Sequence, residues 1–177
     1  EVEFIKILES VVSLYPKLRI VVEHVTSSRM IDWVIAQSKG TIGATITPHH
    51  LLLTLADVIG YSKESKGLLL PHNFCKPIAK SDVDLKAIVN AALSGNPRFF
   101  LGTASAPHSK ENKECAECCA GVFSAPVAIP ILAQVFDEME SLEKLENFCS
   151  VFGPEFYVLE PSKDTLEVRR SNWAVPS

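Results

Sequence analysis

The stretch RFFLGTASAPH, residues 98–108, decides the fold. Its apolar run Phe99–Leu101 lies between the turn residues Gly95–Pro97 and Gly102, which is typical of a short buried strand. Small residues then let the backbone approach a ligand, and His108 follows within a few positions. Active sites of (β/α) barrels lie at the C-terminal ends of their strands. The stretch therefore predicts one strand of such a barrel, with a polar site beyond its end.

The same pattern occurs twice upstream. The β-branched, apolar run at 18–25 predicts a buried parallel strand that ends at His24, and the run at 41–47 predicts a strand that His50 follows. Helical periodicity separates these strands. The predicted helices are 3–15, a segment from the N-cap residues 26–28 to Gly40, a short helix within 51–66, 81–92, 125–139 with a kink at Pro130, and 141–152. Polar loops are predicted at 61–66 and 109–117. Weaker strand candidates are 68–74, 156–158 and 165–168.

Alternating strands and helices predict an α/β fold with a parallel sheet of about four strands. A complete (β/α)8 barrel takes roughly 250 residues, so 177 residues predict the C-terminal half of a TIM barrel with a short C-terminal extension. We expect one domain over 1–177, with βα units over 1–140 and a C-terminal helix and tail over 141–177. Half a barrel leaves two sheet edges exposed. The opening residues Glu1–Phe4 lack an initiating Met, so we expect a piece of a longer protein.

Composition narrows the classes of partner. The net charge of −4 argues against nucleic acid or an anionic membrane surface as the main partner. No apolar run reaches the roughly 18 residues of a membrane span.

Five cysteines, an odd number, favour free thiols in a reducing, cytoplasmic compartment. Cys115 and Cys118 form a CxxC pair with no second pair elsewhere, which favours a loop of thiols over a structural zinc site.

Three histidines follow three predicted strand ends. His24, His50 and His108 would converge on one rim of a barrel, and imidazole is the commonest metal ligand. Each alone is more often a structural residue; together they favour a metal rim. His49 and His72 fit the pattern less well and are expected to be surface or packing residues.

Several separated motifs resemble one family, dihydroorotase, in its C-terminal portion. This is the single-function zinc enzyme of pyrimidine biosynthesis, in the amidohydrolase superfamily. The resemblance covers nearly the whole chain and loosens after about Tyr157. The motifs that carry it are VVEHVTS at 21–27, ATITPHHL at 44–51, NFCKPIAK at 73–80, GTASAPH at 102–108, CAGVF at 119–123 and AIPILAQVFDE at 128–138.

The resemblance implies a homodimeric enzyme with two zinc ions, which reversibly cyclises N-carbamoyl-L-aspartate to L-dihydroorotate with loss of water. His24 and His50 correspond to ligands of the two metals, and His24 also counts among the substrate-binding positions. His108 corresponds to the histidine that holds the substrate carboxylate. Lys76 and Ala120 fall where main-chain groups bind the pyrimidine ring. The Lys76 side chain itself suits an anionic substrate or a solvated surface.

Two departures from the family predict an inactive chain. Ala104 stands where the family has Asp, a metal ligand and the general base, and a methyl group can neither ligate zinc nor accept a proton. General acid–base catalysis contributes on the order of 10²–10⁴-fold. The family's HxH pair, its Arg and Asn for the substrate carboxylate and its metal-bridging lysine are also not found. Two imidazoles alone should bind zinc weakly, because protein zinc sites use three or four ligands.

Two alternatives stay open at the level of sequence. A non-catalytic homologue could act as a scaffold or regulatory partner, retaining His108 without turnover. A related hydrolase could open a hydantoin-like cyclic amide. The segments 73–80 and 119–123 argue against the second alternative, because they match the family's contacts to the dihydroorotate ring.

Overall fold

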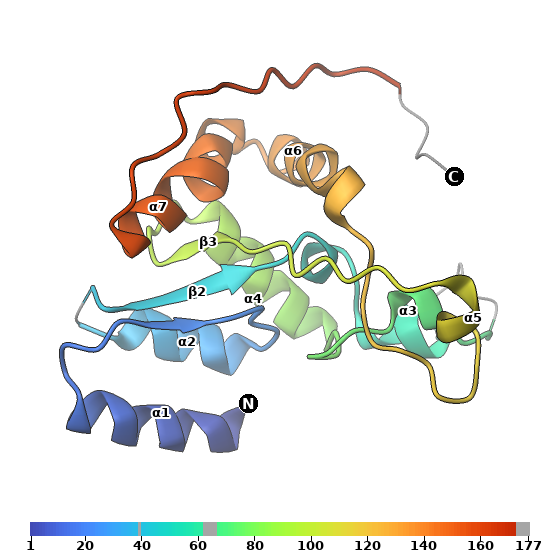
Figure 1. Ribbon diagram of the computed structural model, residues 1–177, viewed down its shortest axis with the longest axis horizontal. Coiled ribbons are helices and arrows are strands. Elements are labelled where there is room, and N and C mark those ends of the chain that lie inside the picture. Colours follow the sequence, from blue (N-terminus) through green and yellow to red (C-terminus); the bar gives the residue numbers. More distant parts are fainter. Residues whose placement is uncertain (39, 62–66, 173–177) are drawn as a thin grey trace.

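A parallel three-stranded sheet forms the centre of the chain (Figure 1). The computed structural model describes residues 1–38, 40–61 and 67–172. The strands lie in the order β1 (Ile20–Val22), β2 (Ile42–Ile46), β3 (Phe99–Leu101). Ile20 pairs with Ile42, and Ala44 pairs with Phe99. The α/β class and these three strands are confirmed, although β1 is shorter than the predicted 18–25.

The weaker strand candidates are wrong. Residues 68–74 contain a 3₁₀ turn, η2 (Pro71–Asn73), instead of a strand. Pro71 lacks a backbone N–H for a sheet ladder, and its fixed φ suits the start of a helical turn. The candidate at 156–158 overlaps α7 (Phe152–Tyr157), and 165–168 has no regular structure. The described sheet therefore has three strands and not four.

Two of the long helices begin where short polar side chains cap them. Ser27 accepts a hydrogen bond from the Met30 N–H at 3.3 Å, at the start of α2. Ser81 and Asp84 form a reciprocal capping box at the start of α4. The four long helices are α1 (Val2–Leu14), α2 (Ser28–Ala36), α4 (Asp82–Leu93) and α6 (Ala128–Glu138).

Short helical turns make up most of the remaining regular structure. They are η1 (His49–Leu51), α3 (Leu55–Ile59), α5 (Lys110–Lys113), η3 (Ala125–Val127), η4 (Leu142–Lys144) and η5 (Asn147–Val151), which precedes α7. The predicted loop at 109–117 thus contains a helical turn, and the predicted helix at 141–152 is divided. Pro130 lies in the first turn of α6, where no N–H is needed, and the helix predicted at 125–139 is divided before it into η3 and α6. Of the polar loop predicted at 61–66, residues 62–66 lie outside the described residues.

The two faces of the sheet are covered differently. Ala44, Ile46 and Phe99 belong to the main apolar core, together with residues of α2 and α4. Gly43 and Phe100 point to the opposite face, where the end of the chain packs. A Cβ on Gly43 would lie 3.0 Å from ring atoms of both Phe100 and Phe156 of α7. Glycine is therefore required at 43 for α7 to close against the sheet.

The strands point from α7 toward a lobe that carries α3 and α5 (Figure 1). Because all three strands are parallel, their C-terminal ends meet at the same edge. The segments that follow β1, β2 and β3 therefore meet beside that lobe. No helix among the described residues has the length and apolar character to cross a bilayer.

Candidate active site at the strand ends

His24 lies in the turn after β1 and has an unusual backbone conformation. Its φ is +43°, in the left-handed region that non-glycine residues seldom adopt. Its backbone N–H donates to Thr45 Oγ1 at 2.7 Å, which attaches it to the end of β2. Its Nδ1 is buried and has no hydrogen-bond partner among the described residues. A buried, unpaired imidazole nitrogen is suited to a ligand that the protein itself does not supply.

His50 lies in η1, directly after β2. Its Nδ1 lies 2.8 Å from Thr47 Oγ1, and its Nε2 lies 3.0 Å from the Pro77 carbonyl oxygen. Cys75 Sγ is 3.4 Å from the same Nε2. The His49 ring packs at 4.5 Å, centroid to centroid, from the His50 ring. The turn after β2 thus places His49 and His50 beside the Cys75 thiol of a later segment, in one buried cluster.

Burial holds these histidines neutral. It lowers the pKa of His49 to about 4, and the nearby charge of His24 lowers it further. It lowers the pKa of His50 to about 3, with smaller contributions from His49 and His24. The neutral imidazole is the form that binds metals. His24 and His50 follow the neighbouring parallel strands β1 and β2, so both lie at the C-terminal edge of the sheet.

Ala104 follows β3 and adopts the same unusual backbone as His24. Its φ is +42°, and its side chain is exposed. Two of the three described strands, β1 and β3, are therefore followed within three residues by a left-handed residue. The methyl group of Ala104 offers neither a metal ligand nor a proton acceptor at this place.

His108 and Ala120 are in direct contact. His108 Nε2 donates to the Ala120 carbonyl oxygen at 3.1 Å, and the Ala106 N–H donates to Val122 at 3.0 Å. Gly121 makes this pairing possible, because a Cβ there would lie 2.6 Å from the Ala106 carbonyl oxygen. A cavity of about 270 Å³ adjoins the pairing. It is lined by His72, Asn73, Ala106, His108, Lys113, Gly121, Val122 and Phe123.

Lys113 holds the walls of this cavity together. Its side chain is buried, and Nζ donates to the carbonyl oxygens of Phe74, Cys119 and Gly121 at 3.0, 2.8 and 2.8 Å. The Gly121 N–H also donates to the Phe74 carbonyl at 2.9 Å. One buried cation thus joins the segment that leads to Lys76 with the segment around Ala120.

Lys76 itself is exposed. Among the described interactions its ammonium group has no partner, whereas the carbonyl of the next residue, Pro77, lies against His50. The Pro77 carbonyl therefore faces the cluster. A binding role for the main chain of Lys76 stays a prediction.

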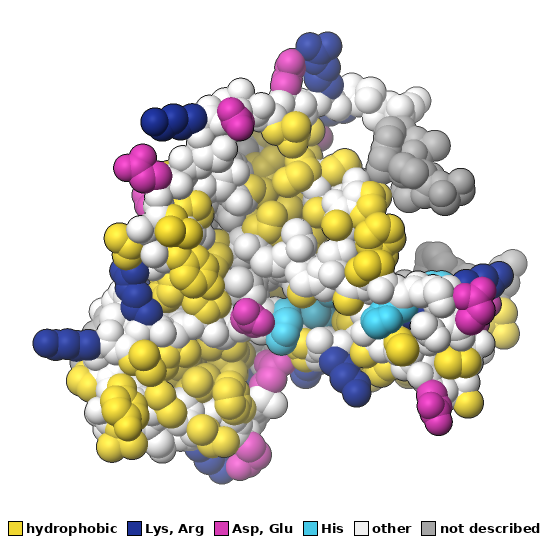
Figure 2. Space-filling model, in the orientation of Figure 1, with side chains coloured by type: hydrophobic (Ala, Val, Ile, Leu, Met, Phe, Trp, Pro, Cys, Tyr) yellow, Lys and Arg dark blue, Asp and Glu magenta, His cyan; other side chains and the backbone are white. Residues whose placement is uncertain are grey.

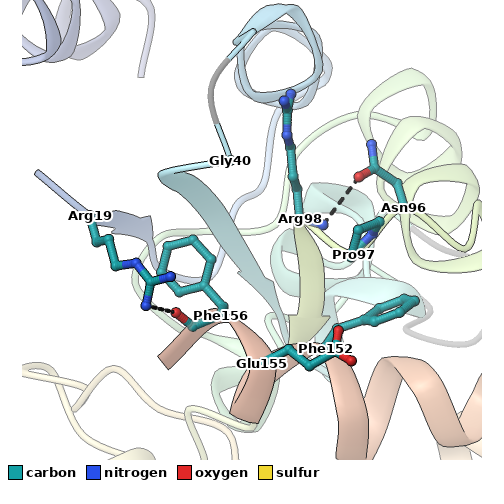
Figure 3. A pocket seen from close by; sticks show the side chains of 8 residues that line it. All are labelled: Arg19, Gly40, Asn96, Pro97, Arg98, Phe152, Glu155 and Phe156. Carbon is teal, nitrogen blue, oxygen red and sulfur yellow. Dashed lines mark hydrogen bonds between the residues drawn. The ribbon is translucent and has the colours of Figure 1, made fainter. Parts of the chain in front are cut away.

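A larger cavity lies at the other end of the strands (Figure 3). It measures about 580 Å³, and Arg19, Gly40 and Arg98 line it where β1, β2 and β3 begin. Its polar groups are already occupied: Arg19 donates to the Phe156 carbonyl at 2.6 Å, and Arg98 donates to Val34 and Ile35 at the end of α2. Catalytic groups of parallel barrels lie at C-terminal strand ends. We therefore assign a packing role to this cavity.

Sequence reasoning missed His49, Cys75 and Lys113. His49, expected at the surface or in packing, is buried within the cluster. The burial of Lys113 depends on contacts with distant segments, so no local pattern marks it. Cys75 lies in the NFCKPIAK motif, but nothing in the sequence places its thiol beside His50. Cys115 and Cys118 are free thiols outside the His49, His50 and Cys75 cluster, as are Cys119 and Cys149.

Comparison with known proteins finds relatives of one kind. No family model matches the chain. The chain is 41% identical to mitochondrial dihydroorotase of Arabidopsis thaliana over 96% of its own length and 44% of the relative. It is 44% identical to dihydroorotase of Teredinibacter turnerae, over 96% of its length and 47% of that protein. The chain therefore spans less than half of these curated relatives.

Solved structures of dihydroorotases are also similar to this chain. A crystal structure of Saccharomyces cerevisiae dihydroorotase in complex with 5-fluoroorotic acid matches with a TM-score of 0.78 and 42% identity, over 86% of this chain and 42% of that one. Dihydroorotase from Campylobacter jejuni matches with a TM-score of 0.81 and 41% identity, over 93% and 46%. Fold and site define an α/β protein with an imidazole cluster at its C-terminal strand ends. More particularly, the chain is homologous to part of the dihydroorotases.

Proposed function

We propose that this chain is the C-terminal half of a dihydroorotase barrel, in which three strand ends contribute to a site for dihydroorotate and carbamoyl aspartate. The observation that carries the proposal is the convergence of His24 and His50 at one sheet edge, in a chain 41–44% identical to dihydroorotases. The unpaired edges of the described sheet, at β1 and β3, would adjoin the other strands of the barrel.

His24 and His50 are the residues that would hold zinc. The buried, unpartnered Nδ1 of His24 fits this role, and so does the neutral ring of His50. Ala104 does not fit, because it has no donor atom. Two metal ions in a complete site would polarise the ring amide carbonyl and lower the pKa of water.

The cavity beside His108 is the proposed substrate subsite. His108 would bind the substrate carboxylate, and the Ala120 and Lys76 main chain would bind the ring. Lys113 fixes the positions of both segments through its three carbonyl contacts. Ring contacts made by main-chain groups need a rigid backbone, and the buried ammonium group supplies that rigidity.

Without an acid–base group at Ala104, this chain would bind substrate without converting it. We expect calorimetric titration with dihydroorotate to show binding, with no product formed. His108→Ala should abolish that binding, whereas Lys144→Gln, a surface change away from the cavity, should retain it. If dihydroorotate does not bind but a stable protein partner does, the non-catalytic scaffold replaces this proposal.

A homodimer in the cytoplasm completes the proposal. The five free thiols suit a reducing compartment. The Arabidopsis relative is named as mitochondrial, so cell fractionation is the direct test of the compartment. Sedimentation analysis would test the dimer.

A further inference from the structure

Three buried donor groups meet beside the proposed substrate subsite. His49, His50 and Cys75 each offer one ligand atom, and these atoms lie within 4.8 Å of one another. Their exposed fractions are 5%, 2% and 3%. Within the described ranges, no other group of three histidine, cysteine or acidic side chains is so close. Two of the three, His49 and Cys75, lie outside the ligand set that the dihydroorotase resemblance implies.

The spacing of this cluster suits a tetrahedral metal. Zinc binds nitrogen at about 2.0–2.1 Å and sulfur at about 2.3 Å, which places tetrahedral N and S donors about 3.5 Å apart. Cys75 Sγ and His50 Nε2 are 3.4 Å apart without rearrangement. The widest separation in the cluster, at most 4.8 Å, requires a shift of about 1 Å to reach the same value.

One donor group has an unpaired nitrogen, and the other two share a single acceptor. His49 Nδ1 is buried with no hydrogen-bond partner among the described residues. A buried polar atom without a partner destabilises the fold. His50 Nε2 and Cys75 Sγ share one acceptor, the Pro77 carbonyl oxygen, at 3.0 and 3.4 Å. A cation at the centre of the cluster would replace one shared contact and satisfy the unpaired nitrogen.

We propose that His49, His50 and Cys75 bind one zinc ion in this chain. Two imidazoles and a thiolate are a ligand set that zinc takes readily, with water in the fourth position. The Cys75 thiol loses its proton to solvent on binding. One nitrogen of His50 cannot bind this zinc ion and an ion held by His24 at the same time. The site formed by His49, His50 and Cys75 therefore competes with the metal site that the resemblance implies for His24 and His50. The proposal does not depend on dihydroorotate binding.

Cobalt substitution tests the site in the whole chain. Co²⁺ added to the metal-free protein should give the near-ultraviolet absorption of a cobalt–thiolate bond, and zinc should displace it. Cys75→Ser should abolish this band, and His49→Gln should weaken affinity more than about tenfold. His24→Gln should leave the band unchanged. The reverse pattern, with binding lost in His24→Gln and retained in Cys75→Ser, would overturn the proposal.

Other thiols provide matched controls. Cys149→Ser and Cys118→Ser should keep the cobalt–thiolate band, because neither thiol belongs to the cluster. Loss of the band in Cys118→Ser would assign the sulfur ligand to the CxxC segment and refute the site. X-ray absorption of the zinc-loaded wild-type chain covers the case in which Cys75→Ser does not fold. One sulfur in the zinc shell is expected, and a shell of nitrogen and oxygen alone would contradict the proposal.

Discussion

At the scale of single residues, Ala104 is strained by its backbone. Alanine at a φ of +42° costs about 1 kcal/mol relative to glycine, because its Cβ crowds the adjacent carbonyl. Ala104→Gly should therefore raise the free energy of unfolding by about 0.5–1 kcal/mol, measured by urea denaturation. Ala106→Gly, two residues on and without a positive φ, is the matched control and should lower it. A loss of stability in both variants would show that the left-handed conformation is not imposed at Ala104.

At the scale of elements, α5 depends on one buried lysine. Lys113→Met removes three hydrogen bonds to carbonyl oxygens, leaves that of Gly121 unpaired and leaves that of Cys119 with only the Cys118 thiol at 3.6 Å. We expect a loss of about 2–4 kcal/mol in the free energy of unfolding, with faster amide exchange around 119–121. Lys110→Met, on the same helical turn but exposed, should change stability by less than about 0.5 kcal/mol. Equal effects of the two substitutions would contradict the role given to Lys113.

The turn η1 should make stability depend on pH. His49 and His50 have pKa values lowered by burial to about 4 and about 3. In the unfolded chain both titrate near 6.5. Their contribution is thus complete above about pH 6.5 and is lost as the pH falls toward about 4 and then 3. Urea unfolding of the metal-free chain should show stability falling from about pH 6.5 to 5, where carboxylates stay ionised.

A substitution isolates that pH dependence. His49→Gln should make the decline below about pH 6.5 shallower, because one fewer histidine takes up a proton on unfolding. His72→Gln should leave the slope unchanged, since His72 is exposed and pairs with Glu114 at the surface. A slope that His49→Gln does not alter would mean that His49 titrates normally in the fold.

The same elements show what local sequence determines. The β-branched run of β2 and the capping residues Ser81 and Asp84 act over a few residues, so the sequence predicts these elements well. The candidate strand at 68–74 was wrong because Pro71 and the contacts of the next segment outweigh its apolar character. Cys75 and Lys113 owe their roles to partners far away in the chain. For that reason the three-donor cluster and the buried lysine emerge only from the three-dimensional structure.

At the scale of the whole molecule, the chain presents much apolar surface. Phe4, Ile7 and Leu14 of α1 are each about half exposed or more, and Figure 2 shows apolar surface spread over the same region. Histidine side chains reach the surface between the sheet and the lobe of α3 and α5. A site shared between this chain and the rest of a barrel would explain both features. The barrel itself remains our proposal, since three described strands fit half of one.

Activity should require both the missing strands and a proton acceptor at position 104. The chain as it stands, with added zinc, should interconvert carbamoyl aspartate and dihydroorotate no faster than background. A version extended to the full length of its relatives and carrying Ala104→Asp should gain turnover by on the order of 10²–10⁴-fold over the same extension with alanine. Aspartate also tolerates the positive φ found there.

The extended protein with Ala104 unchanged is the matched control for this last prediction. It differs from the Ala104→Asp protein only by the carboxylate, so a difference in turnover between the two would locate the defect at one side chain. Turnover by this control would mean that another group moves the proton, and Ala104 would lose the importance given to it. Inactivity of the Asp version, in a protein shown to bind dihydroorotate, would instead show that binding at His108 is retained without the chemistry of the family.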